Sequence, residues 1–219
     1  MADDHLDRFN IAAREYNTDR YPGRAQCARK VLVLLEPRID DVVLDVGCGP
    51  GTQLTYLSRS IRFGYGIDPA EQMIRQAQES TTHCPNLQFY VGSATAFPQE
   101  IHHAGINKIM SNYALHHLPD NAKRESLCNL ASLLPENGTV VLGDLVFSDD
   151  PDKFRSLFDI VGYGPGCDTP SQLSLLEGMF IEAGLSPCTH ILNPLVAVIV
   201  GRKHHCAKNG DGNKFDSHQ

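Results

Sequence analysis

Two hydrophobic patterns alternate along the first two thirds of the chain. Short apolar runs are typical of buried strands, whereas apolar residues recurring every three or four positions are typical of amphipathic helices. The runs predict strands at residues 42–46, 63–67, 87–91, 106–111 and 139–147. The helical pattern predicts helices at residues 6–21, 24–36, 52–60, 70–80 and 120–134. Such alternation predicts a parallel sheet with helices on both faces.

The last third of the chain departs from this alternation. Residues 149–170 are rich in proline and glycine, which predicts an irregular insertion. A helix is expected at residues 171–183, with Gly184 ending it. Two further apolar runs, 188–192 and 195–201, are joined by Asn-Pro and predict an antiparallel hairpin. Residues 204–219 are polar and are expected to form a disordered tail.

The predicted fold class is therefore α/β, with a seven-stranded, mostly parallel sheet that ends in an antiparallel C-terminal hairpin strand. A chain of 219 residues suits one such domain with a full hydrophobic core. The formal net charge of −7 argues against nucleic acid as a partner. The longest apolar runs are far too short to cross a bilayer, so no membrane partner is expected.

The cysteines and the N-terminus concern location and metal binding. Seven cysteines lack any Cys-x-x-Cys pair, which favours reduced thiols in a cytoplasmic protein. The polar, acidic N-terminus is unlike a signal peptide. No ligand cluster has the usual zinc spacing, so no metal is expected. The nearest approach to one is His204-His205-Cys206 in the predicted tail.

A glycine-rich turn, Asp-Val-Gly-Cys-Gly-Pro-Gly at residues 45–51, follows the first predicted strand. Glycine permits positive φ and close approach of a ligand to the backbone. The amides of the turn and the start of the next helix can bind polar or anionic groups. Gly47, Gly49 and Gly51 are spaced G-x-G-x-G, whereas dinucleotide-binding turns have G-x-G-x-x-G. The spacing argues against a nicotinamide-dependent oxidoreductase, and no Walker-type lysine follows.

Two carboxylates lie where predicted strands end. Asp45 ends the first strand beside the turn, and Asp68 ends the second. Ligands of open α/β sheets bind beyond the carboxyl ends of the strands. Asp68 could accept hydrogen bonds from ribose hydroxyls, and Asp45 could face an ammonium or a sulfonium. Alternatively, Asp45 caps the turn and Asp68 caps the helix after Pro69. The turn together with both carboxylates favours ligand binding.

Residues 42–54 followed by Gly-Ile-Asp-Pro at 66–69 resemble motifs I and II of class I S-adenosylmethionine (AdoMet)-dependent methyltransferases. The resemblance continues through residues 91–98, 111–118 and 133–138. The chain is also similar to small bacterial methyltransferases with a Tyr-Ala-(Leu/Phe)-His-His-Leu stretch and a later Asp-x-Val-Phe, here 113–118 and 144–147. The resemblance implies a Rossmann-like methyltransferase fold, AdoMet as cofactor and S-adenosylhomocysteine as product.

The resemblance also implies cofactor contacts for particular residues. They are Asp45, Gly47, Cys48, Gly49, Gly51, Asp68, Pro69, Met73, Ser93, Ala94, Asn112, Tyr16, Arg20 and Tyr21. By resemblance, Asp45 and Asn112 lie near the methionine part and Asp68 holds the ribose. Residues 69–73 cover the adenine, whose edge meets Ser93, where many members of the family have aspartate.

The N-terminal helices, residues 1–36, are expected by the same resemblance to fold as a lid over a methyltransferase domain of residues 37–203. Tyr16, Arg20 and Tyr21 would then reach the cofactor from the lid. Surface packing of this amphipathic segment is the alternative.

Methyl transfer requires alignment more than a dedicated catalytic group, because the sulfonium already activates the methyl. Alignment alone supplies up to about 7–11 kcal/mol. His116 and His117 are candidate general bases or acceptor contacts, since imidazole titrates near neutrality. Alternatively, they only cap the helix that begins at Asp120. Phe154, Arg155, Phe158 and Tyr163 of the insertion could line a substrate pocket or be packing residues.

The sequence thus predicts an AdoMet-dependent methyltransferase of the cytoplasm that acts on a small-molecule acceptor. We expect it to be a monomer or a homodimer. Two other functions fit the same motifs. One is a methyltransferase whose acceptor is RNA or protein, and the other is a non-catalytic protein that binds AdoMet.

Overall fold

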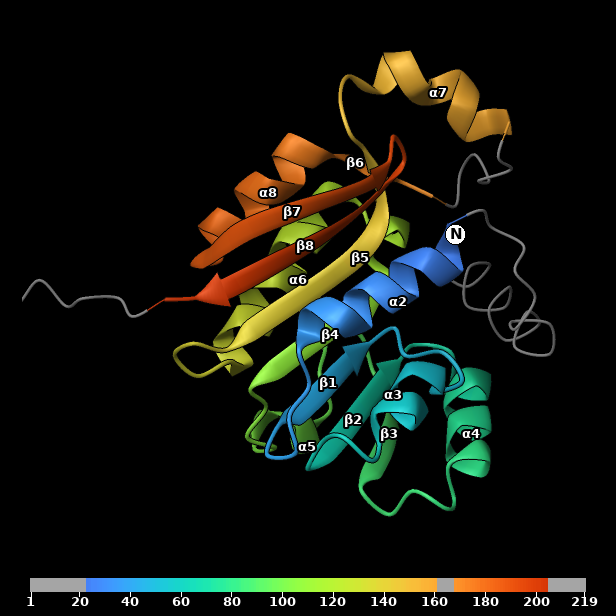
Figure 1. Cartoon of the computed structure of the whole chain (residues 1–219), viewed down its shortest axis with the longest axis vertical. Coiled ribbons are helices and arrows are strands. Elements are labelled where there is room, and N and C mark those ends of the chain that lie inside the picture. Colours follow the sequence, from blue (N-terminus) through green and yellow to red (C-terminus); the bar gives the residue numbers. More distant parts are fainter. Residues whose placement is uncertain (1–22, 161–167, 205–219) are drawn as a thin grey trace, which may run out of the picture.

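The computed structural model describes residues 23–160 and 168–204 of the chain, which form a twisted sheet between two layers of helices (Figure 1). The predicted residues Tyr16, Arg20, Tyr21 and Tyr163 lie outside these ranges, as do residues 1–22 of the predicted lid and 205–219 of the predicted tail.

The sheet contains all the strands that the hydrophobic runs predict. They are β1 (Val42–Val46), β2 (Phe63–Asp68), β3 (Leu87–Val91), β4 (Lys108–Asn112), β5 (Thr139–Phe147), β6 (Ser171–Gln172), β7 (Leu185–Asn193) and β8 (Val196–Lys203). The helices are α2 (Arg24–Leu35), α3 (Thr52–Leu57), α4 (Glu71–Ser80), α5 (Gln99–His102), α6 (Asp120–Leu133), α7 (Pro151–Ile160) and α8 (Leu173–Glu182). A short 3₁₀ helix, η1 (Leu115–His117), follows β4.

The strand order is β3-β2-β1-β4-β5-β8-β7. Strands β1 to β5 are parallel, β8 is antiparallel to β5, and β7 is antiparallel to β8. This confirms the predicted seven-stranded, mostly parallel sheet with its C-terminal hairpin. The two-residue strand β6 pairs with β5 as an eighth, unpredicted strand. The chain moves outward in opposite directions from β1 and β4, so their carboxyl ends form the switch point at which open α/β sheets bind ligands.

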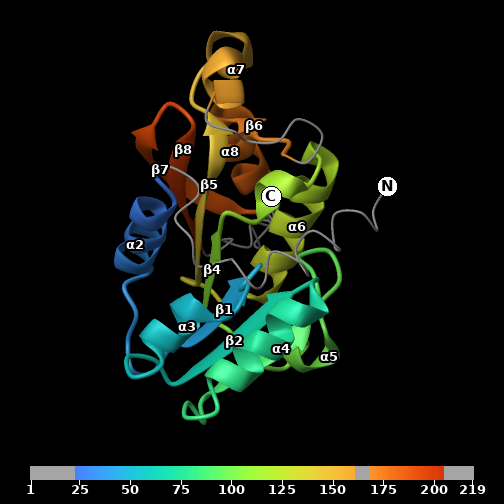
Figure 2. The ribbon, with the colours of Figure 1, turned by 90° about the vertical axis from the view of Figure 1, so that its right-hand side faces the viewer.

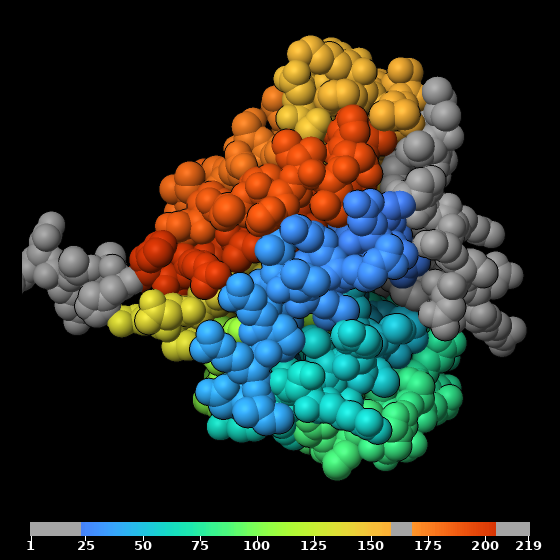
Figure 3. Space-filling model, viewed as in Figure 1, coloured from blue at the N-terminus to red at the C-terminus, as the bar shows by residue number. Residues whose placement is uncertain are grey.

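Helices cover both faces of the sheet, as predicted. One apolar cluster joins α2, α3 and α4 to the first face, and a second joins α6 and α8 to the other. A view turned by 90° shows the two layers on either side of the strands (Figure 2). The space-filling view shows α2 between the β7–β8 hairpin and α3 (Figure 3). Every residue of β1 and β5 is buried, which explains their nearly continuous apolar runs.

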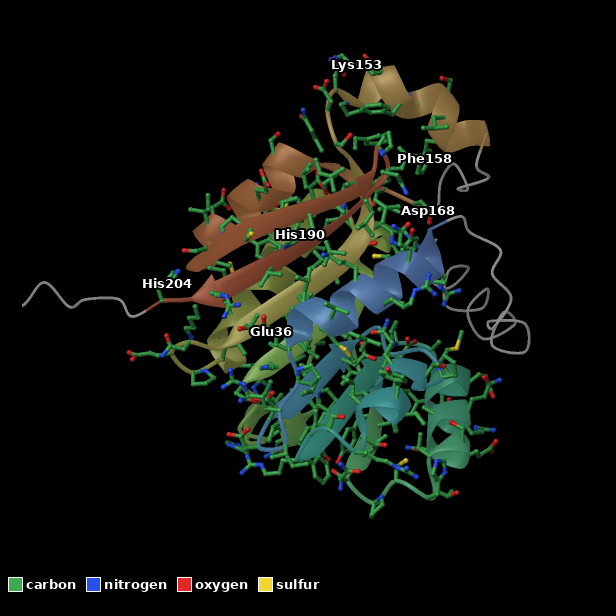
Figure 4. The ribbon with its side chains drawn as sticks, in the orientation of Figure 1. Glu36, Lys153, Phe158, Asp168, His190 and His204 are labelled. Carbon is green, nitrogen blue, oxygen red and sulfur yellow. The ribbon has the colours of Figure 1, made fainter. Side chains whose placement is uncertain are left out.

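The insertion differs from its predicted irregular structure, because residues 151–160 form helix α7. Proline breaks a helix in its interior, but Pro151 occupies the first helical position, where its missing amide hydrogen has no intrahelical acceptor. Phe158 of α7 is buried against Phe147 of β5, with ring centroids 5.6 Å apart (Figure 4). Phe154 packs on the same cluster and Arg155 is exposed, so the two phenylalanines are packing residues.

Smaller differences concern the boundaries of helices. Helix α3 ends at Leu57, three residues before its predicted end, and α5 was not predicted. Helix α8 begins at Leu173, because Ser171 and Gln172 pair with β5. Within the described ranges, no helix is long and apolar enough to span a bilayer. The described cysteines, Cys27, Cys48, Cys84, Cys128 and Cys188, are free thiols.

Candidate active site

The carboxyl ends of β1 and β2 bring Asp45 and Asp68 to the same edge of the sheet. Both side chains are buried. One carboxylate oxygen of Asp68 accepts a hydrogen bond from the Gly49 amide at 2.9 Å, and the other accepts one from the Ala70 amide at 2.9 Å. Asp68 therefore joins the glycine turn to the start of α4. It does so without being the N-cap, since α4 begins at Glu71 and Ala70 is its N-cap.

The two carboxylates differ in their electrostatic surroundings. Burial, followed by the negative charge of Asp68, raises the pKa of Asp45 to about 8. Burial also raises the pKa of Asp68, but its two backbone hydrogen bonds and the nearby His117 oppose that effect. In the described part of the chain, no hydrogen bond offsets the two effects at Asp45. A cation placed beside Asp45 would stabilise its charged form.

The glycine turn packs tightly between its neighbours. Gly47, Gly49 and Gly51 have φ values of 72°, 52° and 78°. A Cβ atom on Gly47 would lie 2.3 Å from the Cβ of Ala114, just before η1, and one on Gly51 would lie 2.8 Å from the Phe89 ring. The turn therefore requires glycine both for its backbone conformation and for its space.

The amides of this turn are used within the protein, which corrects the expectation that they bind ligand groups. The amides of Gly47 and Cys48 donate to the Ile67 carbonyl at 2.8 and 3.0 Å, and the Gly49 amide donates to Asp68. The Gly51 amide donates to the Cys48 carbonyl at 3.1 Å. The hydrogen-bond donors of these four residues are therefore already engaged within the protein.

The remaining predicted cofactor residues surround this edge at different depths. Cys48 and Met73 are buried, and Pro69 is exposed. Burial is also the main cause of the raised pKa of the Cys48 thiol. Cys48 belongs to the apolar cluster that joins α2, α3 and α4 to the sheet, and Met73 is buried on α4.

Ser93 and Ala94 follow β3, whose end is tied to Asp68 through a hydrogen bond from the Gly92 amide to the Asp68 carbonyl at 3.1 Å. The Ser93 hydroxyl accepts a hydrogen bond from the Ala96 amide at 3.1 Å and lies 3.1 Å from the Thr95 hydroxyl. The Ser93 side chain thus stabilises its own turn. Ala94 is buried beside it.

Asn112 ends β4, on the other side of β1 from Asp68. Its side-chain oxygen is buried and has no hydrogen-bond partner among the described residues. An unpaired buried acceptor costs about 1–3 kcal/mol, so a donor is expected at this atom. Asp45 pairs in register with Met110 of β4, which places Asp45 and Asn112 on the same face, two residues apart along the sheet.

His116 and His117 lie in η1, between two carboxylates. The Nδ1 atom of His116 is 2.5 Å from an Asp144 oxygen, and the His116 amide donates to the other Asp144 oxygen at 3.0 Å. The Nδ1 atom of His117 is 3.1 Å from an Asp168 oxygen. The His116 side chain is 5% exposed and that of His117 is 24% exposed, so the second histidine is the more accessible.

A buried lysine fixes the segment that carries Asp168. The Lys123 ammonium donates to the Ser171 hydroxyl at 2.7 Å and to the Thr169 carbonyl, and it is 3.3 Å from Asp120. Thr169 in turn donates its amide to the His116 carbonyl at 2.7 Å. Burial lowers the pKa of Lys123, against the opposing effect of Asp120. This network holds the end of the insertion against η1.

Sequence reasoning assigned no role to Asp144, Asp168 or Lys123. Asp168 is separated from His117 by about fifty residues, so no motif spacing could have joined them. Asp144 belongs to the Asp-x-Val-Phe stretch, but only the fold shows that its carboxylate contacts both the backbone amide and the ring of His116.

Comparison with known proteins identifies the class to which this site belongs. Residues 43–138 match a family model described as a methyltransferase domain. Together with the relatives and the fold, this match supports a class I AdoMet-dependent methyltransferase, as the resemblance in sequence predicted. It is therefore a methyltransferase.

Individual relatives extend the comparison. The chain is 25% identical over 168 residues to an uncharacterized methyltransferase of Bacillus pumilus, covering 74% of this chain and 76% of the relative. The YcgJ protein of Bacillus subtilis has the same fold, with a TM-score of 0.70 and 20% identity over 83% of this chain and 99% of that one. Magnesium protoporphyrin IX methyltransferase of Synechocystis, solved with bound SAH, has a TM-score of 0.65 and 17% identity over 83% and 84% of the two chains.

Proposed function

We propose that this methyltransferase binds AdoMet at the carboxyl ends of β1, β2 and β4 and transfers the methyl group to a small-molecule acceptor. The observation that carries the proposal is Asp45, a buried carboxyl whose pKa is raised to about 8 and which no described hydrogen bond stabilises. AdoMet carries a sulfonium and an ammonium, and either charge beside Asp45 would stabilise the carboxylate.

The other residues of this edge fit the same cofactor. The buried oxygen of Asn112 can accept a hydrogen bond from the ammonium. Asp68 keeps lone pairs beyond its two backbone hydrogen bonds, and these can accept the ribose hydroxyls. Of residues 1–36, the helix α2 packs on the sheet with Cys27, Val31 and Leu35 fully buried, so the lid proposal concerns residues 1–22.

On the acceptor side we place His117. It is the more exposed of the two histidines, and its helix η1 begins directly after Ala114, which packs against Gly47 of the glycine turn. His116 is buried and held by Asp144 at two points, which favours a positioning role. Bound AdoMet supplies an activated methyl. The chain's residues then need to orient the acceptor in line with that methyl and exclude water.

Two observations support a small-molecule acceptor. The net charge of −7 disfavours nucleic acid. The neighbour from Synechocystis is named for magnesium protoporphyrin IX, and a further neighbour with a TM-score of 0.66 is named for geranyl diphosphate, and both are small molecules. The cytoplasmic location and the monomeric or homodimeric state stay predictions.

Calorimetric titration of the full chain with AdoMet, S-adenosylhomocysteine and NAD tests the donor site. We expect tight binding of the first two. Asp68→Ala should weaken it about 10- to 150-fold, the equivalent of about 1.5–3 kcal/mol for a charge-assisted hydrogen bond. Glu71→Ala, an exposed residue at the start of the same helix, is the matched control and should bind normally. NAD binding without AdoMet binding, or unchanged affinity in Asp68→Ala, would contradict the proposal.

Release of S-adenosylhomocysteine during incubation with a metabolite extract tests the acceptor side. His117→Ala should lower turnover more than it lowers AdoMet affinity. If turnover stays at the wild-type level, His117 has no part in acceptor binding. If only RNA or protein fractions support turnover, the acceptor is a macromolecule.

A further inference from the structure

Three side chains that can each bind a metal ion converge at the end of the insertion. The Nε2 atom of His116 is 3.6 Å from an Asp168 oxygen, and the Nδ1 atom of His117 is 3.1 Å from the same oxygen. One ligand atom from each residue lies within 4.8 Å of the others. Ligands bound to one tetrahedral ion at about 2.0–2.1 Å lie about 3.3 Å apart. The two distances to Asp168 are close to this value, and the largest separation in the cluster, up to 4.8 Å, would shorten by up to about 1.5 Å to enclose an ion.

The surroundings of His116 match those of a metal ligand. Asp144 accepts a hydrogen bond from the backbone amide of His116 and lies 2.5 Å from its Nδ1 atom, which directs Nε2 toward Asp168. Histidines that bind metals commonly donate their other ring N–H to a carboxylate, which fixes the tautomer and the ring orientation. Asp144 is itself held by the Leu145 amide at 2.8 Å.

The third ligand is equally well fixed. Asp168 precedes Thr169, which donates its amide and its hydroxyl to the His116 carbonyl at 2.7 and 3.0 Å. Lys123 binds the carbonyl of the same threonine. Figure 4 shows Asp168 on the side of the sheet from which α7 projects. The backbones that carry all three side chains are thus joined to one another, as in a preorganised ligand site.

We propose that His116, His117 and Asp168 bind a divalent transition-metal ion with the coordination preferences of Zn²⁺. Two imidazole nitrogens suit zinc and its neighbours, whereas Mg²⁺ and Ca²⁺ prefer oxygen ligands throughout. Three protein ligands on a tetrahedral ion leave one position for water or for an exogenous ligand, the arrangement of catalytic zinc sites.

If the proposed methyl transfer also holds, this ion lies near the donor site, because η1 begins directly after Ala114, which packs against Gly47 of the glycine turn. An acceptor hydroxyl or thiol in the open position would release its proton to solvent, since zinc lowers the pKa of bound protic groups. The acceptor's oxygen or sulfur would then form a bond to the methyl carbon. The carbon–sulfur bond would break with its electron pair remaining on sulfur, which yields S-adenosylhomocysteine.

The experiment uses the untagged full-length chain, stripped of metal with a chelator. Titration with Co²⁺, followed by its visible d–d absorbance, and with Zn²⁺, followed by calorimetry, should show one ion per chain. Asp168→Asn and His117→Gln should each weaken binding at least about tenfold, and Asp144→Asn about 10- to 100-fold. His190→Gln, on β7 away from the cluster, is the matched control and should bind normally.

A second control removes the two adjacent histidines and the cysteine at the start of the predicted C-terminal tail. The triple variant His204→Gln, His205→Gln, Cys206→Ser should keep the cobalt spectrum. Absence of binding at micromolar ion, or binding that survives Asp168→Asn and His117→Gln but is lost in the tail variant, would overturn the site. Near-ultraviolet circular dichroism of each variant separates loss of a ligand from loss of the fold.

The metal site and the methyl transfer can fail separately. A normal cobalt spectrum in a chain that binds no AdoMet would leave the metal site standing and contradict the proposed function. Normal AdoMet binding in a chain that binds no metal would support the proposed function and contradict the metal site. The two histidines would then be joined to Asp168 by hydrogen bonds alone.

Discussion

Asp45→Asn should raise the stability of the fold while it weakens cofactor binding. The substitution keeps the size of the side chain and removes its charge. Asp45 is 2% exposed, and burial together with Asp68 raises the pKa of its carboxyl from 3.8 to about 8. Between these values the folded chain holds a proton that the unfolded chain has released. Because the unfolded state binds fewer protons, stability must fall as the pH rises through this range.

The size of the effect follows from that range. Each pKa unit corresponds to about 1.4 kcal/mol, so Asp45 should reduce the free energy of unfolding by about 4 kcal/mol between about pH 5 and pH 8. The Asp45→Asn variant lacks this contribution. Titrating groups that do not interact with Asp45 contribute equally in both chains and cancel, whereas the coupling between Asp45 and Asp68 is part of the measured effect. The unpaired asparagine amide has its own cost of burial, but that cost does not change with pH.

Urea unfolding of both chains without cofactor, at about pH 5 and pH 8, measures the difference directly. The Asp45→Asn variant should gain on the wild type by about 4 kcal/mol over that interval. Its affinity for AdoMet at pH 8 should fall about 10- to 150-fold, because a charged partner contributes about 1.5–3 kcal/mol. If the free energy of unfolding depends on pH in the same way in both chains, the pKa of Asp45 is not raised in the folded state. Unchanged AdoMet affinity would refute its role at the cofactor.

Two further substitutions test the framework of the site. Gly47→Ala should destabilise the fold by about 2–4 kcal/mol in urea unfolding, because it combines a φ of 72° with a Cβ contact of 2.3 Å to Ala114. Gly178 lies in α8, and a Cβ atom added there would have nothing within 4 Å, so Gly178→Ala should instead stabilise the fold by about 0.5–1 kcal/mol. If both substitutions change the free energy of unfolding equally, Gly47 is not under strain at the turn. Lys123→Met should cost about 1–3 kcal/mol and speed hydrogen exchange at the Thr169 amide, whereas the exposed control Lys153→Met should change neither. If the Thr169 amide exchanges as slowly in the Lys123 variant as in the wild type, Lys123 does not hold the insertion in place.

The backbone of the proposed donor site was predictable because its parts are close in sequence. The strand, the glycine turn and Asp68 lie within about 25 residues, and each has a local pattern that the backbone obeys. What the sequence could not show is how the turn uses its amides. Hydrogen bonds from Gly47 and Cys48 to Ile67 depend on the register between β1 and β2, which no local pattern specifies.

The surroundings of His116 and His117 were predictable only in part, because tertiary contacts build them. The two histidines stood out as residues able to titrate, yet their partners Asp144 and Asp168 come from β5 and from beyond α7. The insertion was interpreted as irregular because of Pro151. The structure shows a helix there, since proline is harmless at the first helical position and Phe158 has a buried site against Phe147.

Three buried carboxylates of the parallel strands separate structural roles from a role in ligand binding. Asp68 accepts two backbone amides, and Asp144 accepts two amides and contacts a histidine ring. Those contacts account for their burial. Asp45 has neither kind of contact among the described residues, and its position lowers the stability of the fold above about pH 4. A positively charged ligand would remove that cost when it binds. Of the three carboxylates, Asp45 is therefore the one whose position is best explained by bound AdoMet.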